Sequence, residues 1–155
     1  MQDPLFSVED KIVIITGGLG QLGSNYTKAF LERGSKVALF EHSEPTPERL
    51  EKVFGELAKS ENLRAYKVDI TVKDEINTAL DDVEKVWGTP DVLVNNAGLD
   101  TQPSAPPEVS GPFENFPEDV FRQVVEVNLV GAFLIDQAVG ARMARAGKPG
   151  SIINV

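Results

Sequence analysis

Short apolar runs alternate with longer amphipathic segments along almost the whole of this 155-residue chain, and this alternation constrains the fold more than any other feature. Short apolar runs are typical of strands that are buried on both faces, and amphipathic segments are typical of helices that cover them. Strands that are regularly separated by helices build a parallel sheet. The pattern predicts an α/β fold, a three-layer doubly wound parallel sheet, with five strands at residues 11–16, 36–41, 64–69, 91–96 and 151–155.

Four helices are expected between these strands, at residues 21–32, 47–59, 72–87 and 117–146. Thr46 and Pro47 supply a cap and a first residue for the second of them. The segment 98–117 fits neither period and holds five of the ten prolines in the chain. Because proline fixes φ and removes a donor, we expect an ordered or semi-rigid loop there, without helix or strand. No linker or internal repeat is visible, so residues 1–155 are expected to form a single domain.

Charge and composition exclude several classes of function. A net charge of −9 repels nucleic-acid backbones and anionic lipid, so neither is expected as a partner. Without cysteine and with one histidine, His42, the chain has no disulfide, no thiolate nucleophile and no multi-histidine metal site. The amino terminus does not resemble a signal peptide, and no apolar stretch approaches the roughly 20 residues of a membrane-spanning helix. A cytoplasmic protein is expected.

A glycine-rich turn follows the first strand and opens the first helix. Gly18, Gly20 and Gly23 satisfy the pattern G-x-G-x-x-G, in which glycines permit a tight turn, a close approach to pyrophosphate and close packing of helix on strand. The helix start adds N–H groups and a positive dipole end. A turn that is glycine-rich for steric reasons alone is the alternative. The predicted dinucleotide-binding residues of this turn are Gly17, Gly18, Leu19, Gly20, Gln21, Leu22 and Gly23.

Glu41 ends the second strand, eighteen positions after Gly23, where this motif places an acid that binds the ribose hydroxyls. A carboxylate there accepts hydrogen bonds from the diol and repels a 2′-phosphate, so NAD is favoured and NADP is less favoured as the cofactor. A solvated acid at the end of a strand is the alternative for Glu41. His42 beside it is interpreted as a surface residue or as a wall of the adenosine pocket.

Five motifs resemble, in order and spacing, those of the short-chain dehydrogenase/reductases, and they lie at residues 16–23, 68–70, 95–98, 127–129 and 150–154. The resemblance implies a Rossmann fold and an NAD(P)-dependent oxidoreductase that transfers hydride between an alcohol and a ketone. It implies that Asp69 binds the adenine amino group and that the backbone at Ile70 lines the ring. It also assigns the central edge of the cofactor to the most specific motif, Asn95, Asn96, Ala97 and Gly98.

Asn128 interrupts an apolar helical face, and Gly131 follows three residues later. Both residues weaken a helix relative to alanine, so a functional reason is expected for them. By resemblance, Asn128 is the helix-kinking asparagine whose main-chain carbonyl holds a water in a proton relay, and it is the one catalytic residue predicted here. Simpler alternatives stay open: a satisfied buried amide for Asn128, and for Asp69 a cap before Thr71, which does not exclude adenine binding.

The chain departs from the family pattern in two places. Gln21 occupies the position of the middle glycine, an arrangement that also resembles the longer, nucleotide-sugar-acting branch of the family. The catalytic serine would lie about two residues beyond Val155, with the Tyr-x-x-x-Lys pair further on, and neither Tyr26 nor Tyr66 is followed by lysine at that spacing. We therefore expect the 155 residues alone to be inactive or nearly so. An apolar edge strand at 151–155 should also promote self-association.

The sequence thus predicts the cofactor-binding portion of an NAD-dependent short-chain dehydrogenase/reductase. A small alcohol or ketone is the expected substrate, and the resemblance implies a homo-oligomer in which the long fourth helix forms the dimer face. Two alternatives stay open: a non-catalytic NAD-binding sensor or interaction module, and the nucleotide-sugar-acting branch.

Overall fold

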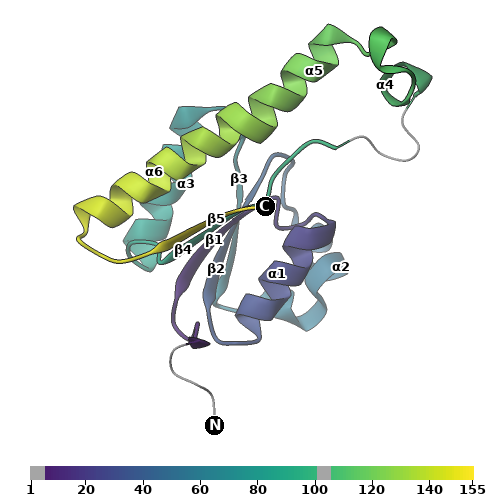
Figure 1. Ribbon diagram of the computed structural model, residues 1–155. Coiled ribbons are helices and arrows are strands. Elements are labelled where there is room, and N and C mark those ends of the chain that lie inside the picture. Colours follow the sequence, from purple (N-terminus) through teal and green to yellow (C-terminus); the bar gives the residue numbers. More distant parts are fainter. Residues whose placement is uncertain (1–5, 101–105) are drawn as a thin grey trace.

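A computed structural model describes residues 6–100 and 106–155 of the chain. Its strands form one parallel sheet in the order β3-β2-β1-β4-β5, and helices cover both faces (Figure 1). The strands are β1 (Ile12–Thr16), β2 (Lys36–Glu41), β3 (Leu63–Lys67), β4 (Val92–Asn95) and β5 (Ser151–Asn154). The predicted α/β doubly wound fold with five strands is confirmed.

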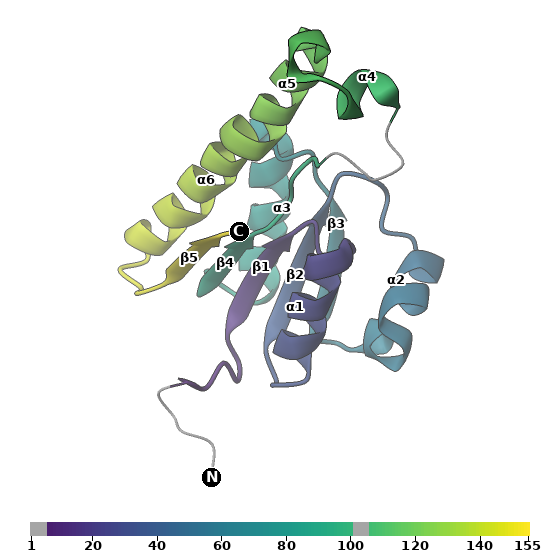
Figure 2. The ribbon, with the colours of Figure 1, turned by 45° about the vertical axis from the view of Figure 1, so that its right-hand side comes forward.

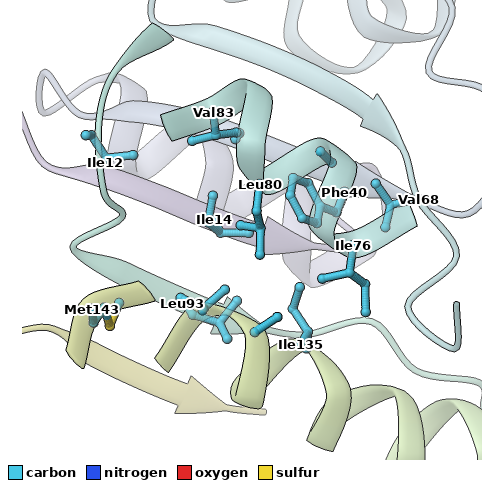
Figure 3. Close-up of a cluster of buried hydrophobic side chains, with 14 residues drawn as sticks. Ile12, Ile14, Phe40, Val68, Ile76, Leu80, Val83, Leu93, Ile135 and Met143 are labelled. Atoms are coloured by element: carbon cyan, nitrogen blue, oxygen red, sulfur yellow. The ribbon is translucent and has the colours of Figure 1, made fainter. Parts of the chain in front are cut away.

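Two helical layers sandwich the sheet (Figure 2). One layer holds α1 (Gln21–Leu31) and α2 (Pro47–Phe54), and the other holds α3 (Lys73–Val86) and α6 (Ala132–Arg145). Strand β1 is buried along its whole length because its side chains alternate between two hydrophobic clusters. Ile12 and Ile14 face α3 and α6, in the cluster that Figure 3 draws. Val13 and Ile15 face α1 and α2.

Helix bounds differ from the expected ones where the backbone changes its winding. The second helix stops at Phe54, and a 3₁₀ turn, η2 (Gly55–Lys59), completes the predicted span, because Gly55 takes a positive φ of 57°. The predicted fourth helix is a continuous rod of three parts. These are α5 (Glu118–Val125), a π-helical turn η4 (Glu126–Gly131) and α6.

The expectation that segment 98–117 holds no helix is wrong. It contains α4 (Pro107–Ser110) and a 3₁₀ turn, η3 (Phe113–Asn115), while residues 101–105 lie outside the described part. Each turn begins at or directly after a proline, whose fixed φ is already that of a helical first residue. Proline therefore started short helical turns in this segment.

The expectation about apolar stretches also needs correction. The rod Glu118–Arg145 is 28 residues long and, within the described residues, is long and apolar enough by composition to cross a membrane. Part of the rod is packed inside the domain, since 22% of its most apolar stretch is buried. Ile135, Val139 and Met143 of α6 are buried against the sheet and α3, as in the core helix of a globular domain.

Strand β5 forms one edge of the sheet and pairs only with β4 among the described residues. Ile152, Ile153 and Val155 expose 40, 47 and 65% of their surface, so the expected apolar edge is present. Self-association through this edge stays a prediction.

Candidate functional site

The order of the strands locates the candidate site. The chain runs outward from β1 through β2 to β3 on one side, and β4 and β5 lie on the other, so the strand order reverses between β1 and β4. In open parallel sheets, ligands bind outside the carboxyl ends of the strands at such a reversal. The residues that follow β1, β2, β3 and β4 meet at this edge.

The glycine-rich turn leaves β1 through Gly17, which has a φ of 65°, a region that favours glycine. The Gly17 N–H donates to the Phe40 carbonyl of β2 at 2.9 Å, and the Gly20 N–H donates to the Gly17 carbonyl at 3.1 Å. Gly20 then caps α1 without a side-chain hydrogen bond. The first N–H groups of the helix therefore point out of a turn that no side chain caps.

Two glycines of the turn have no room for a side chain. A Cβ on Gly23 would lie 2.1 Å from the Gly17 carbonyl oxygen and 2.9 Å from Asn96 Nδ2. A Cβ on Gly18 would lie 2.4 Å from Leu39 Cδ2. Gly20 is less confined, because its nearest neighbour would be the Gly17 oxygen at 3.2 Å. The helix start is thus held tightly against bare main chain.

Glu41 is buried at the end of β2 and accepts a hydrogen bond from the Leu19 N–H of the glycine turn. Burial raises the pKa of Glu41, and the Leu19 N–H and the charge of Arg49 oppose that shift. The alternative of a solvated strand-end acid is therefore wrong. Leu19 itself packs its side chain into the core, and its N–H is already paired with Glu41.

Asp69 follows β3 and bonds to Thr71 in the turn before α3, but it does not cap that helix, because its N-cap is Val72 and no side chain bonds there. Its Oδ1 accepts from the Thr71 N–H at 2.8 Å and from the Thr71 hydroxyl at 2.7 Å. The Thr71 hydroxyl is the main cause that lowers the pKa of Asp69, with the Thr71 N–H and His42 adding to it against burial. His42 Nε2 lies 3.6 Å from Asp69 Oδ2, and the His42 side chain is 81% exposed.

Thr16 organises the end of β4, and the sequence analysis assigned it no contact. Its fully buried hydroxyl donates to Asn95 Oδ1 and accepts from the N–H groups of Asn96 and Ala97, both at 2.9 Å. Asn96 Nδ2 donates to the Thr16 and Gly17 carbonyls at 3.1 and 3.2 Å. The sequence feature that could have indicated this role is the hydroxyl of Thr16, the last residue of an otherwise apolar strand.

Asn128 lies within the π-helical turn, so the predicted break in the helix is present. Its side-chain amide pairs with both backbone groups of Leu99: Oδ1 accepts from the N–H at 2.7 Å, and Nδ2 donates to the carbonyl at 2.9 Å. Gly131 ends the turn, and a Cβ there would lie 2.8 Å from Ile70 Cγ1. The π-helical turn therefore packs closely against Ile70.

Two of the cavities at this edge share part of their lining. One, of about 250 Å³, lies over β1, β2 and β3 and includes Gly17, Glu41, His42, Asp69 and Ile70. The other, of about 350 Å³, lies over β4 and β5 and includes Asn95, Asn96, Asn128, Asp136 and Asn154. Ala97 and Gly98 line both cavities.

Of the seven predicted residues of the glycine-rich turn, Gly17 alone lines one of these two cavities. The six that follow, residues 18–23, lie beside the cavities, and Gln21 and Leu22 are exposed on the first turn of α1. Among the described residues, no group of three or more His, Cys, Asp or Glu side chains could hold a metal ion.

Arg142 is a charged residue of α6 whose buried position the sequence did not predict, and it lies away from the cavities. It is 7% exposed and bonds to Asp81, Glu84 and Asn77 of α3. We assign it to helix packing, because its partners join α6 to α3.

Fold and site together define a class: a doubly wound α/β domain with a glycine-rich turn at the reversal point of its sheet. The sequence profile of the short chain dehydrogenases matches residues 11–155. The chain belongs to this short-chain dehydrogenase family, as its motifs indicated.

Named relatives agree with this membership. An NAD-dependent glycerol dehydrogenase of Listeria innocua is 31% identical over 99% of this chain and 55% of its own length. A 5-keto-D-gluconate 5-reductase of Escherichia coli is 33% identical over 97% of this chain and 55% of its own. A short chain dehydrogenase from Leptospira borgpetersenii, solved with bound NAD+, superposes with a TM-score of 0.78 at 30% identity over 98% of this chain and 53% of its own. The chain spans about half the length of the relatives it matches.

Proposed function

We propose that residues 1–155 are a single Rossmann domain, the cofactor-binding portion of an NAD-dependent oxidoreductase that transfers hydride between a secondary alcohol and a ketone. One observation carries the proposal: two cavities meet at Ala97 and Gly98, at the reversal point of the sheet. A dinucleotide consists of two nucleosides joined by a charged pyrophosphate, and this arrangement offers one cavity for each nucleoside.

The residues at this edge fit a nicotinamide dinucleotide. The uncapped start of α1 would hold the pyrophosphate, because bare N–H groups and the helix dipole favour an anion there. Gly18 and Gly23 let the turn and α1 pack closely, because a side chain on Gly18 would collide with Leu39 and one on Gly23 with Gly17. When bound, the nicotinamide ring supplies or accepts the hydride.

Glu41, Asp69 and Ile70 would hold the adenosine half in the cavity over β1 to β3. Asp69 keeps its second carboxylate oxygen beside His42 while its first accepts from Thr71, so the turn contact and adenine binding are compatible. Asn128 and the segment from Asn95 to Gly98 would border the nicotinamide half in the other cavity.

Proton transfer needs a further group. Tyr66 is an unsuitable acid because burial, together with the Asp82 carboxylate that accepts a hydrogen bond from its hydroxyl, raises the pKa of Tyr66 to about 12. Tyr66 also lies on β3, outside both cavities. We propose that the main-chain carbonyl of Asn128 is the contribution of these 155 residues to a proton relay, and that alone they bind the cofactor with little or no turnover.

We propose a small alcohol or ketone as the substrate class, which the names of the glycerol dehydrogenase and keto-gluconate reductase relatives support. The proposal extends to a homo-oligomer built on the long helical rod, which exposes Phe121, Leu129 and Phe133. The net charge of −9 argues against nucleic acid or anionic lipid as partners. A cytoplasmic location fits the packing of α6, the carboxyl-terminal part of the rod, on the sheet.

We propose NAD rather than NADP because Glu41 borders the adenosine cavity and its charge would repel a 2′-phosphate. Calorimetric titration of the chain with both cofactors tests this. We expect NAD to bind at least about tenfold more tightly, a difference of about 1.4 kcal/mol. Glu41→Gln should reduce the ratio of the affinity for NAD to that for NADP, because the neutral amide no longer repels the 2′-phosphate.

Glu51→Gln is the matched control, since it removes the same charge from an exposed position on α2. It should leave the ratio of the two affinities unchanged. Binding of neither cofactor would defeat the proposed function. A tenfold preference for NADP would defeat the assignment of NAD alone.

A further inference from the structure

A carboxylate on α6 joins the two strands that border the second cavity. Asp136 accepts a hydrogen bond from Asn95 Nδ2 at 3.2 Å through one oxygen and from Asn154 Nδ2 at 3.1 Å through the other. Asn95 ends β4 and Asn154 ends β5. One half-buried side chain therefore fastens the ends of two neighbouring strands to the helix that covers them.

The contact continues from Asn95 into the centre of the site. Asn95 Nδ2 also donates to the Ala132 carbonyl of α6 at 3.0 Å, while Asn95 Oδ1 accepts from the Thr16 hydroxyl at 3.1 Å. That hydroxyl in turn accepts the N–H groups of Asn96 and Ala97. Asn95 is 3% exposed and Thr16 is fully buried, so little solvent reaches these bonds.

Two acceptors set the direction of these hydrogen bonds. The Asp136 carboxylate oxygen and the Ala132 carbonyl both accept from the Asn95 amide nitrogen and hold it toward α6. The Asn95 oxygen must then face Thr16, whose single proton is used on it. The lone pairs of the Thr16 hydroxyl are left for the two backbone N–H groups.

We propose that Asp136 is a positioning residue for the cofactor: through Asn95 and Thr16 it fixes the backbone N–H groups of Asn96 and Ala97, where the main chain enters the wall of Ala97 and Gly98 that the two cavities share. The inference rests on the proposed function, because it assumes a dinucleotide that spans this wall. It assigns Asp136 an effect on the half of the ligand that lies over β4 and β5.

Two ligands separate this effect from a general loss of structure. AMP fills only the adenosine half of the site, which Glu41 and Asp69 border, whereas NAD fills both halves. Asp136→Leu removes both acceptors in a side chain of similar size. We expect NAD to bind about tenfold more weakly to this variant and AMP to change less than about twofold.

Asp136→Asn should restore NAD binding to within about threefold, a difference of about 0.7 kcal/mol. Its amide oxygen can still accept from Asn95, and exposed Asn154 can turn to accept from the new amide. Gln137→Leu is the control, because Gln137 is the next residue of α6 and bonds to Lys73 of α3 instead of the strands. It should leave both affinities unchanged.

Titration calorimetry on the wild-type chain and the three variants, each checked for folding by circular dichroism, decides the matter. If Asp136→Leu binds NAD and AMP more weakly by the same factor, the inference is overturned. Unchanged NAD binding to this variant would also overturn it. If Asp136→Leu does not fold, the test uses Asp136→Asn alone. NAD binding to Asp136→Asn that is tenfold weaker than to wild type would then overturn the inference. Wild-type protein that binds neither ligand would instead defeat the proposed function.

Discussion

Replacing Gly23 by alanine tests the central geometric claim, that α1 packs against bare main chain. Gly23 lies in the first turn of α1, where alanine has a higher helix propensity than glycine. Propensity alone would therefore make Gly23→Ala more stable by about 1 kcal/mol. The structure predicts the opposite sign.

The steric cost follows from what surrounds the new methyl group. It would lie 2.1 Å from the Gly17 oxygen and 2.8 Å from the Gly18 Cα, and both are backbone atoms that cannot rotate away. Overpacking typically costs about 1–3 kcal/mol, and contacts this short belong at the upper end. Subtracting the gain in propensity leaves a net loss of about 2 kcal/mol, which corresponds to about 4–8 °C in melting temperature for a domain of this size.

The assay is urea unfolding of wild type and variant, paired with titration of NAD. Gly140→Ala is the matched control, because Gly140 lies inside α6 and its new Cβ would meet Ile152 Cδ1 at an ordinary 3.4 Å. The control should gain about 0.5–1 kcal/mol. If Gly23→Ala is as stable as wild type and binds NAD equally well, the close packing of α1 on the turn is refuted.

Three further changes test other parts of the structure. Thr16→Val leaves the partly buried backbone N–H groups of Asn96 and Ala97 without their acceptor, so urea unfolding should show a loss of about 2 kcal/mol. For Asp91, burial raises the pKa, but the Ile12 N–H and the ammonium groups of Lys148 and Lys11 outweigh it and hold the pKa below its usual value. Asp91→Asn should therefore cost stability at neutral pH, and the difference from wild type should shrink as pH falls below about 5. Arg142→Lys loses the forked contacts with α3 and should cost about 1–2 kcal/mol in urea unfolding without weakening NAD binding.

Each of these three predictions can be contradicted by a specific result. Thr16→Ser keeps the hydroxyl, so a loss as large as that of Thr16→Val would show that the missing hydrogen bonds are not the cause. A stability difference for Asp91→Asn that stays constant from neutral pH down to about pH 3 would exclude the lowered pKa as its origin. Weaker NAD binding to Arg142→Lys would contradict the assignment of Arg142 to helix packing alone, because the contacts of α6 with α3 would then affect the cofactor site.

Much of the fold was predictable because it depends on local preferences. The apolar runs of β1, β2 and β4 are buried on both faces, as their composition requires, and the strand bounds agree within a few residues. The turns in segment 98–117 were missed because proline there was interpreted only as a breaker. Proline also starts helical turns, and which role it takes depends on the residues that follow.

The site was predictable in its residue types but not in its hydrogen bonds. A glycine turn, an acid after β2 and an asparagine in a helix are visible in the chain, because each breaks a local rule. The partners of these groups were not visible. Glu41 bonds to Leu19, twenty-two residues away, and Asn128 bonds to Leu99, twenty-nine residues away.

The sequence by itself determined where the strands and the long helices form and which turn is rich in glycine, because periodicity and glycine act between residues that are near in the chain. The tertiary structure alone decided which polar groups meet. Thr16, Asn95 and Asp136 come from three different elements and join only because β1, β4 and α6 are placed side by side. Buried polar groups must find partners after the chain has closed on itself, so the contacts that shape this site depend on the packing of the whole domain.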